Sequence, residues 1–208
     1  MSRRLGLLVT DASPLITLAA ADALDCLTMP GLRVVIPDMV YLEVTENLAK
    51  TGAEEVIAWY RRHQAQIEIA PTVIFAEFQV LRSASPRARS RGRGEQAALE
   101  VLNAAISDDP ELEALLLYED NDIRTRRFVR GLPERVAALS TGDLLHELQE
   151  AGRIQSADHL LDVAAESERN VSQQREPSPD DAARRLLRQH LQRQSPARSR
   201  TPPLPGEQ

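Results

Sequence analysis

The stretch LLVTDASPLITLA, residues 7–19, is the strongest indication of how this chain folds. Residues 7–10 are apolar and typical of a buried strand, which we expect to be the first strand of the fold. Asp11 follows directly at the end of this strand. Ser13 and Pro14 then suit the start of a helix, because a hydroxyl can cap the first turn and proline fits there. A helix cap does not also require Asp11, so this acid points to partner acids elsewhere in the chain.

Strand-like and helix-like segments alternate along most of the chain. The predicted strands are residues 7–10, 34–37, 67–70, 114–118 and 136–139, and the predicted helices are residues 13–28, 38–50, 53–65, 94–106, 141–151 and 156–168. The start of the fourth strand is open, since ELEALLL, residues 111–117, could also extend a helix. Apolar strands separated by crossover helices predict a parallel sheet covered on both faces. We therefore expect a three-layer α/β/α domain over residues 3–170, with its site beyond the carboxyl ends of the strands.

Two segments depart from this pattern. Residues 82–93 are rich in serine, arginine and proline without periodicity, which predicts a mobile basic loop that either steers RNA or is a solvated linker. Residues 171–208 shift to glutamine, serine, proline and arginine, which predicts a mostly disordered tail. Within the tail, residues 180–192 have a capped, amphipathic helix pattern. Such a helix could dock on its own domain, on a second subunit or on another protein.

Composition excludes several classes of protein. The 208 residues carry a net charge of −6, and aromatic residues make up only 3%, which argues against a base-stacking surface for single-stranded nucleic acid. The single Cys26 excludes an internal disulfide and a cysteine-based zinc site. The four histidines lack the spacing of a transition-metal site. The apolar run at the start is too short for a signal peptide or a membrane span, so we expect a cytoplasmic protein without a membrane partner.

Acids at three further places could join Asp11. Glu43 shares the apolar face of its predicted helix, and Asp38 is a plausible cap at the start of that helix. Glu95 lies on the buried face of the helix 94–106, although an acid in a first turn also complements the helix dipole. Three acids lie within residues 119–122, directly after the fourth strand. A turn that is rich in acids is ordinarily just exposed to solvent.

Taken together, these acids predict one metal-binding pocket. Carboxylates gathered on one rim repel each other and raise each other's pKa, and a hard divalent cation relieves that repulsion. Oxygen-only ligands suit Mg²⁺ or Mn²⁺. Such a metal activates water and stabilises the charge that builds on a phosphoryl group during in-line displacement.

Four blocks of the sequence resemble the PIN-domain family, in particular the bacterial branch of predicted nucleases allied to VapC-type toxins. The blocks are VTDASPLITLA (9–19), VVIPDMVYLEV (34–44), GRGEQAALEVL (92–102) and LLLYEDNDIR (115–124). The resemblance implies a PIN-like fold and a metal-dependent ribonuclease, usually a homodimer and often restrained by a small antitoxin. By position, it implies an acidic quartet that serves both catalysis and metal binding: Asp11, Glu43, Glu95 and Asp120.

The same resemblance implies roles for neighbouring residues and shows two departures. Ser13 would sit close to the metal, and Arg124 would lie at the cleft edge for a phosphate or an acidic partner. Many family members have aspartate where this chain has Glu95. Because Glu119 precedes Asp120 where the branch tends to have paired aspartates, Glu119 or Asp122 could face the metal instead.

Two functions compete at this point. The first is a Mg²⁺- or Mn²⁺-dependent endoribonuclease that hydrolyses RNA phosphodiester bonds, as the toxin of a toxin–antitoxin pair. The second is a non-catalytic protein that keeps the fold and binds nucleic acid or a protein partner. The acids favour the first, whereas the two departures and the basic loop favour the second.

Overall fold

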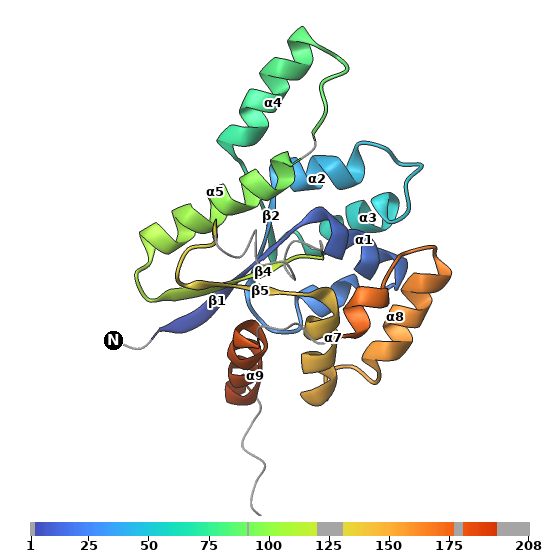
Figure 1. The fold of residues 1–208 in the computed structure, drawn as a ribbon, viewed down its shortest axis with the longest axis vertical. Helices are drawn as coiled ribbons and strands as arrows, with labels where there is room; N and C mark the ends of the chain where they lie inside the picture. The colour runs from blue at the N-terminus through green and yellow to red at the C-terminus, as the bar shows by residue number, and fades with distance from the viewer. Residues whose placement is uncertain (1–2, 91, 120–130, 177–180, 195–208) are drawn as a thin grey trace, which may run out of the picture.

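A computed structural model of the chain describes residues 3–90, 92–119, 131–176 and 181–194. Five parallel strands form one sheet in the order β3-β2-β1-β4-β5 (Figure 1). Their bounds are β1 Arg4–Thr10, β2 Arg33–Pro37, β3 Ile67–Ala70, β4 Leu112–Leu117 and β5 Val136–Leu139. All five predicted strands are confirmed, and β4 resolves the alternative of a helix over residues 111–117 in favour of a strand.

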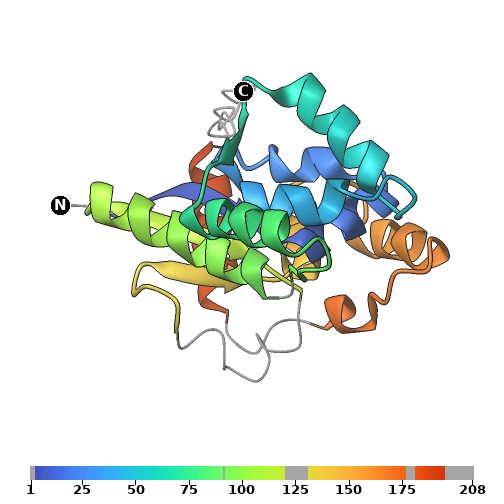
Figure 2. The ribbon, with the colours of Figure 1, turned by 90° about the horizontal axis from the view of Figure 1, so that it is seen from above.

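Helices cover both faces of the sheet, which gives the predicted three layers (Figures 1 and 2). Side chains of β1 alternate: Leu7 and Val9 pack under α5 (Arg93–Asp108), whereas Leu8 faces the opposite layer. That layer contains α1 (Ala12–Ala20), α3 (Ala53–His63), α7 (Thr141–Glu150), α8 (Ala157–Glu166) and α9 (Ala182–Gln194). Each fully buried leucine contributes about 1.5–3 kcal/mol, so the strands must be apolar on both faces.

Strand register brings the predicted site residues to one edge of the sheet. Thr10 of β1 pairs with Leu117 of β4, so Asp11 and Tyr118 follow neighbouring strand ends. The backbone N–H of Asp11 donates to the Leu117 carbonyl at 3.0 Å, which fixes Asp11 at this edge. The helices α1, α2 (Asp38–Thr45) and α7 all begin here, since each directly follows its strand.

Two predicted helices are shorter in the structure. The prediction of one helix over residues 13–28 is wrong: α1 ends at Ala20, and a separate 3₁₀ helix, η1, covers Leu24–Leu27. Asp22 lies between them with φ of 51°, a left-handed conformation that aspartate tolerates and that periodicity does not reveal. The helix predicted to reach residue 50 ends at Thr45.

The predicted cap at Asp38 is also wrong in detail, because Pro37 occupies the N-cap position of α2. The Asp38 carboxylate instead accepts hydrogen bonds from both the backbone N–H and the hydroxyl of Thr72, at 3.0 and 2.6 Å. Thr72 in turn caps α4 (Val73–Ala84), a helix that the sequence pattern did not predict. Asp38 therefore connects the start of α2 to the start of α4.

Part of the predicted basic loop is helical. Arg82 lies in α4, where its guanidinium contacts Glu46 at 3.1 Å, and Arg93 is the first residue of α5. Both guanidinium groups lie over the ring of Phe78, at 5.9 and 5.5 Å from its centroid. Arg91 lies outside the described residues.

The expected tail contains structure within its described parts. Ser172–Arg175 form a 3₁₀ helix, η3, and α9 corresponds to the helix predicted over residues 180–192. Leu187 and Leu191 of α9 belong to the main hydrophobic core, so this helix docks on its own domain. Within the part of the chain described here, no helix is both long and apolar enough to cross a membrane.

Candidate functional site

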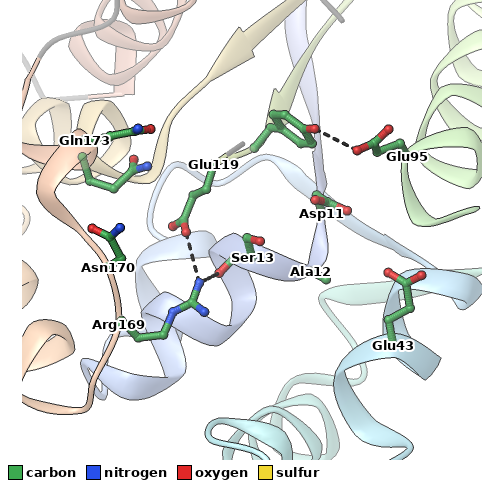
Figure 3. A pocket seen from close by; sticks show the side chains of 11 residues that line it. Asp11, Ala12, Ser13, Glu43, Glu95, Glu119, Arg169, Asn170 and Gln173 are labelled. Carbon is green, nitrogen blue, oxygen red and sulfur yellow. Dashed lines mark hydrogen bonds and ion pairs between the residues drawn. The ribbon is translucent and has the colours of Figure 1, made fainter. Parts of the chain in front are cut away.

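A cavity of about 410 Å³ lies at the carboxyl ends of the central strands (Figure 3). It is lined by Asp11, Ala12, Ser13, Glu43, Glu95, Tyr118, Glu119, Arg169, Asn170, Gln173 and Gln174. The structure thus brings together Asp11, Ser13, Glu43, Glu95 and Glu119, which the sequence predicted as site residues. The predicted residues Asp120, Asp122 and Arg124 lie outside the described part of the chain.

Asp11 and Glu43 converge beside Gly94 at the start of α5. A Cβ atom at Gly94 would lie 2.8 Å from Glu43 Oε2 and 3.4 Å from Asp11 Oδ1. Only glycine leaves this space to the two carboxylates. The pKa of Glu43 is raised to about 7, first by burial and then by the negative charge of Asp11, while a hydrogen bond from Ser90 lowers it. The pair therefore has the electrostatic signature of a cation site.

Glu95 enters the same cavity from α5 and is held by a neighbour. The hydroxyl of Tyr118 donates to Glu95 Oε1 at 2.9 Å (Figure 3). Tyr118 follows β4 and its side chain is buried. This contact fixes the Glu95 carboxylate at the wall of the cavity.

Glu119 is a deeply buried acid of the cavity, with 7% of its side chain exposed. Its Oε2 atom accepts from the Thr17 hydroxyl at 2.9 Å and contacts Arg169 Nη2 at 3.4 Å. Burial raises its pKa, while Thr141, Thr17 and Arg169 each lower it in part. Even so, Glu119 Oε1 and Thr141 Oγ1 have no partner with hydrogen-bond geometry among the described residues. A buried carboxylate oxygen without a hydrogen-bond partner is energetically costly.

The described residues fit a divalent cation in part. Asp11 and Glu43 supply two oxygen donors that repel each other, which is the donor chemistry that Mg²⁺ and Mn²⁺ select. Among the residues that the structure describes, no three Asp, Glu, His or Cys side chains lie close enough together to form a complete metal site. Asp120, the fourth acid of the predicted quartet, comes directly after Glu119 in the sequence, just past the part of the chain that the structure describes there.

Comparison with known families agrees with the fold. A family model described as a PIN domain matches residues 7–84. Over these residues the chain is similar to PIN domains. No curated protein and no solved structure gave a match.

The matched residues span β1 to α4 and include Asp11, Ser13 and Glu43. Glu95 and Glu119 lie beyond the match. They reach the same cavity because α5 and β4 pack beside the matched strands. Asp143 lies in the first turn of α7 and outside the cavity lining, and its N–H donates to Ser140 Oγ, the cap of that helix, at 3.0 Å.

Sequence reasoning missed several residues of the cavity, notably Tyr118, Arg169 and Gln174. Arg169 comes from the segment after α8, where the sequence ESERN contains no recognised motif. The only feature of the sequence that pointed to Arg169 was its place as a positively charged residue just after an amphipathic helix. Positively charged residues at such places are common on protein surfaces. The placement of Arg169 against Thr17 and Glu119 depends on long-range packing.

Proposed function

We propose that this protein is a PIN-domain nuclease, a Mg²⁺- or Mn²⁺-dependent endoribonuclease that hydrolyses RNA phosphodiester bonds. PIN domains are generally nucleases. The observation that carries the proposal is the convergence of Asp11 and Glu43 on the space beside Gly94, with a Glu43 pKa of about 7. The carboxylates of Asp11 and Glu43 repel each other at this edge of the sheet, so their proximity does not stabilise the fold. They favour a cation and a phosphate as the groups that the cavity binds.

In this proposal Asp11 and Glu43 would hold the metal, and Glu95 and Asp120 would complete the acidic quartet. A metal held there would supply an activated water and charge stabilisation at the phosphate. Tyr118 keeps Glu95 oriented toward the cavity. Ser13 lines the cavity between the acids and Arg169. Glu119 is engaged by Thr17 and Arg169, so we assign it a positioning role rather than a place among the ligands.

Digestion of RNA in Mg²⁺ tests the proposed activity. Wild-type protein should cleave structured or unstructured RNA, and Asp11→Asn should reduce the rate by at least about 100-fold, since a ligand and its charge are lost. Glu54→Gln is the matched control, because Glu54 is exposed in the first turn of α3 and does not line the cavity. Absence of cleavage by the wild type, or undiminished cleavage by Asp11→Asn, would refute the nuclease.

The alternative is a PIN-fold protein that binds nucleic acid or a protein partner without catalysis. Its support is that the described acids form only a pair, while Glu95 and Glu119 already have protein partners. Titration with Mn²⁺ separates the two functions. Binding of Mn²⁺ with a rise in melting temperature favours the nuclease, and the absence of both favours the non-catalytic protein.

We further propose that the protein is a toxin that forms a homodimer and is restrained by a cognate antitoxin. Helix α4 supports an interface, since it projects from the body of the molecule (Figure 1) and exposes Val73, Val80 and Leu81. Val73 and Val80 are seven residues apart, so they share one face of the helix. Exposed apolar side chains on one face are typical of a surface that another chain covers. A small antitoxin-like reading frame beside the gene would support the toxin role.

A further inference from the structure

The cavity has two chemically different sides. In the view of Figure 3, Glu43 and Glu95 lie on one side and Arg169, Asn170 and Gln173 on the other, with Asp11 and Ser13 between them. An RNA strand carries a negative charge at every nucleotide, so an acidic wall repels each phosphate that a cation does not hold. Among the described residues that line the cavity, Arg169 is the only one with a cationic side chain.

One edge of the Arg169 guanidinium is fixed by the protein. Arg169 Nε and Nη2 donate to Thr17 Oγ1 at 3.2 and 3.1 Å, and Nη2 also reaches the Ser13 carbonyl at 3.3 Å and Glu119 Oε2 at 3.4 Å. The third nitrogen, Nη1, has no partner among the described residues, and 27% of the side chain is exposed. A planar guanidinium held by one edge presents its other donors in a fixed direction, which suits a phosphate oxygen.

The segment that carries Arg169 is also held in place. Val171 is buried, and the amide oxygen of Gln174 accepts from the Gly142 N–H at 3.2 Å. A Cβ atom at Gly142 would lie only 1.8 Å from the Gln174 carbonyl oxygen, so this close approach requires glycine. Asn170 Oδ1 accepts from the Ser172 hydroxyl at 2.8 Å. Arg169 is therefore preorganised before any ligand arrives, which lowers the entropic cost of binding.

We propose that Arg169 forms a phosphate subsite that binds single-stranded RNA at the nucleotide next to the cleaved bond. This inference rests on the proposed function, because the acids define which phosphate is cleaved. Arg169 lines the same cavity of about 410 Å³ as the acids, so a phosphate that Arg169 binds would lie near the bond that the acids cleave. The competing explanation is that Arg169 only neutralises the buried Glu119. That explanation accounts for the contacts of Nη2, and it leaves Nη1, which has no partner among the described residues, without a role.

Binding of a short, fluorescently labelled single-stranded RNA in EDTA tests the subsite without metal-dependent cleavage. Arg169→Gln should weaken binding by about tenfold or more, the loss of a charge-assisted hydrogen bond, and lower the salt slope by about one unit. Arg169→Lys should recover only part of the affinity, because lysine lacks the fork. Arg175→Gln is the matched control, since Arg175 lies on η3 and contacts Asp162 at the surface. It should bind RNA like the wild type.

Two further variants separate the subsite from the structural ion pair. Glu119→Gln frees Arg169 from its acid partner and should bind RNA at least as tightly as the wild type. The double variant Arg169→Gln/Glu119→Gln removes both charges and should bind as weakly as Arg169→Gln. If the double variant regains wild-type affinity, or if Arg169→Gln binds like Arg175→Gln with the same salt slope, Arg169 is only a counter-ion and the subsite is rejected.

The results for the subsite and for the nuclease can be told apart. A wild type that binds RNA in an Arg169-dependent manner but cleaves nothing in Mg²⁺ contradicts the nuclease and leaves the subsite standing. A wild type that cleaves RNA, with Arg169→Gln unchanged in both binding and KM, contradicts the subsite alone. A wild type that binds no RNA in EDTA also contradicts the subsite. A matching single-stranded DNA probe shows whether the 2′-hydroxyl contributes to binding.

Discussion

Among single residues, Gly94 is important to the site because it has no side chain. Gly94 has no Cβ, and the carboxylates of Asp11 and Glu43 occupy the space that this atom would fill. The two acids are thereby held close, and their repulsion together with burial raises the pKa of Glu43 to about 7. Folding of the rest of the domain stabilises this unfavourable pair, as is common at functional sites.

The first prediction concerns Gly94→Ala. The new methyl group should displace the flexible end of Glu43 and lower Mn²⁺ affinity by about tenfold or more, since ligand geometry is disturbed. Stability should be unchanged or slightly higher, because alanine is favoured over glycine in a helix by about 1 kcal/mol. Calorimetric titration with Mn²⁺ beside a thermal melt measures both effects. Wild-type Mn²⁺ affinity in this variant would show that the carboxylates do not share an ion.

The second prediction concerns the pH dependence of stability in EDTA. The folded-state pKa of Glu43 lies near 7, above the ordinary value of 4.5, so the folded protein binds this proton more tightly than the unfolded chain. Glu43 therefore costs stability as pH rises from 4.5 to about 7. Glu43→Gln should remove that cost and gain about 1–2 kcal/mol over the wild type near pH 8, after allowance for solvent screening. Denaturant melts across this range should show the gain shrinking toward about pH 4, and a pH-independent difference would contradict the assigned pKa.

Among the elements, α9 is joined to the domain by charge as well as by apolar packing. Glu147 of α7 is 1% exposed and accepts from Arg184 Nε at 3.1 Å and from Arg188 Nη2 at 2.7 Å. Leu187 and Leu191 of the same helix are buried in the main core. The charged and the apolar contacts of α9 therefore form together when it docks.

The third prediction follows from this docking. Truncation after Glu176 should lower the free energy of unfolding by about 3–5 kcal/mol, because the buried side chains Leu187 and Leu191 are lost from the core and the surface that they cover is exposed. Truncation after Gln194 keeps α9 and serves as the control. Equal melting temperatures for the two truncations would contradict the docking of α9.

In the molecule as a whole, the edge that carries the acids and the projecting α4 are separate surfaces. Met39, Phe78 and Ala97 form a small core that attaches α4 to α2 and α5. Elsewhere on α4, Val80 is 73% exposed. The same helix can therefore be fixed to the domain and still offer an apolar face to another chain.

The fourth prediction concerns assembly. Light scattering should give twice the chain mass of 23.1 kDa for the wild type. Val80→Glu should shift the mass toward the monomer, because it places a charge in the proposed apolar interface. Gln79→Glu adds the same charge at the neighbouring exposed position and should leave the dimer intact. A monomeric wild type would contradict the homodimer. Equal effects of the two substitutions would show that this face of α4 is not the interface.

Local patterns in the amino-acid sequence account for the sheet, the layers and the place of the acids. Strands are recognised from short apolar runs, and the carboxyl ends of parallel strands meet at one edge, so the sequence alone places Asp11 and Glu119 at that edge. The break at Asp22, the helix α4 and the cap at Pro37 escaped prediction. Local patterning does not encode them, and contacts such as that between Asp38 and Thr72 link segments far apart in the chain.

Tertiary packing alone settles which groups meet in the cavity. Gly94 makes room for Asp11 and Glu43, Tyr118 holds Glu95, and Arg169 reaches Glu119 from a segment 50 residues further along the chain. No local pattern encodes such pairings. They arise because burial of the strands and helices forces distant polar side chains into one small space, where unpaired polar groups are costly.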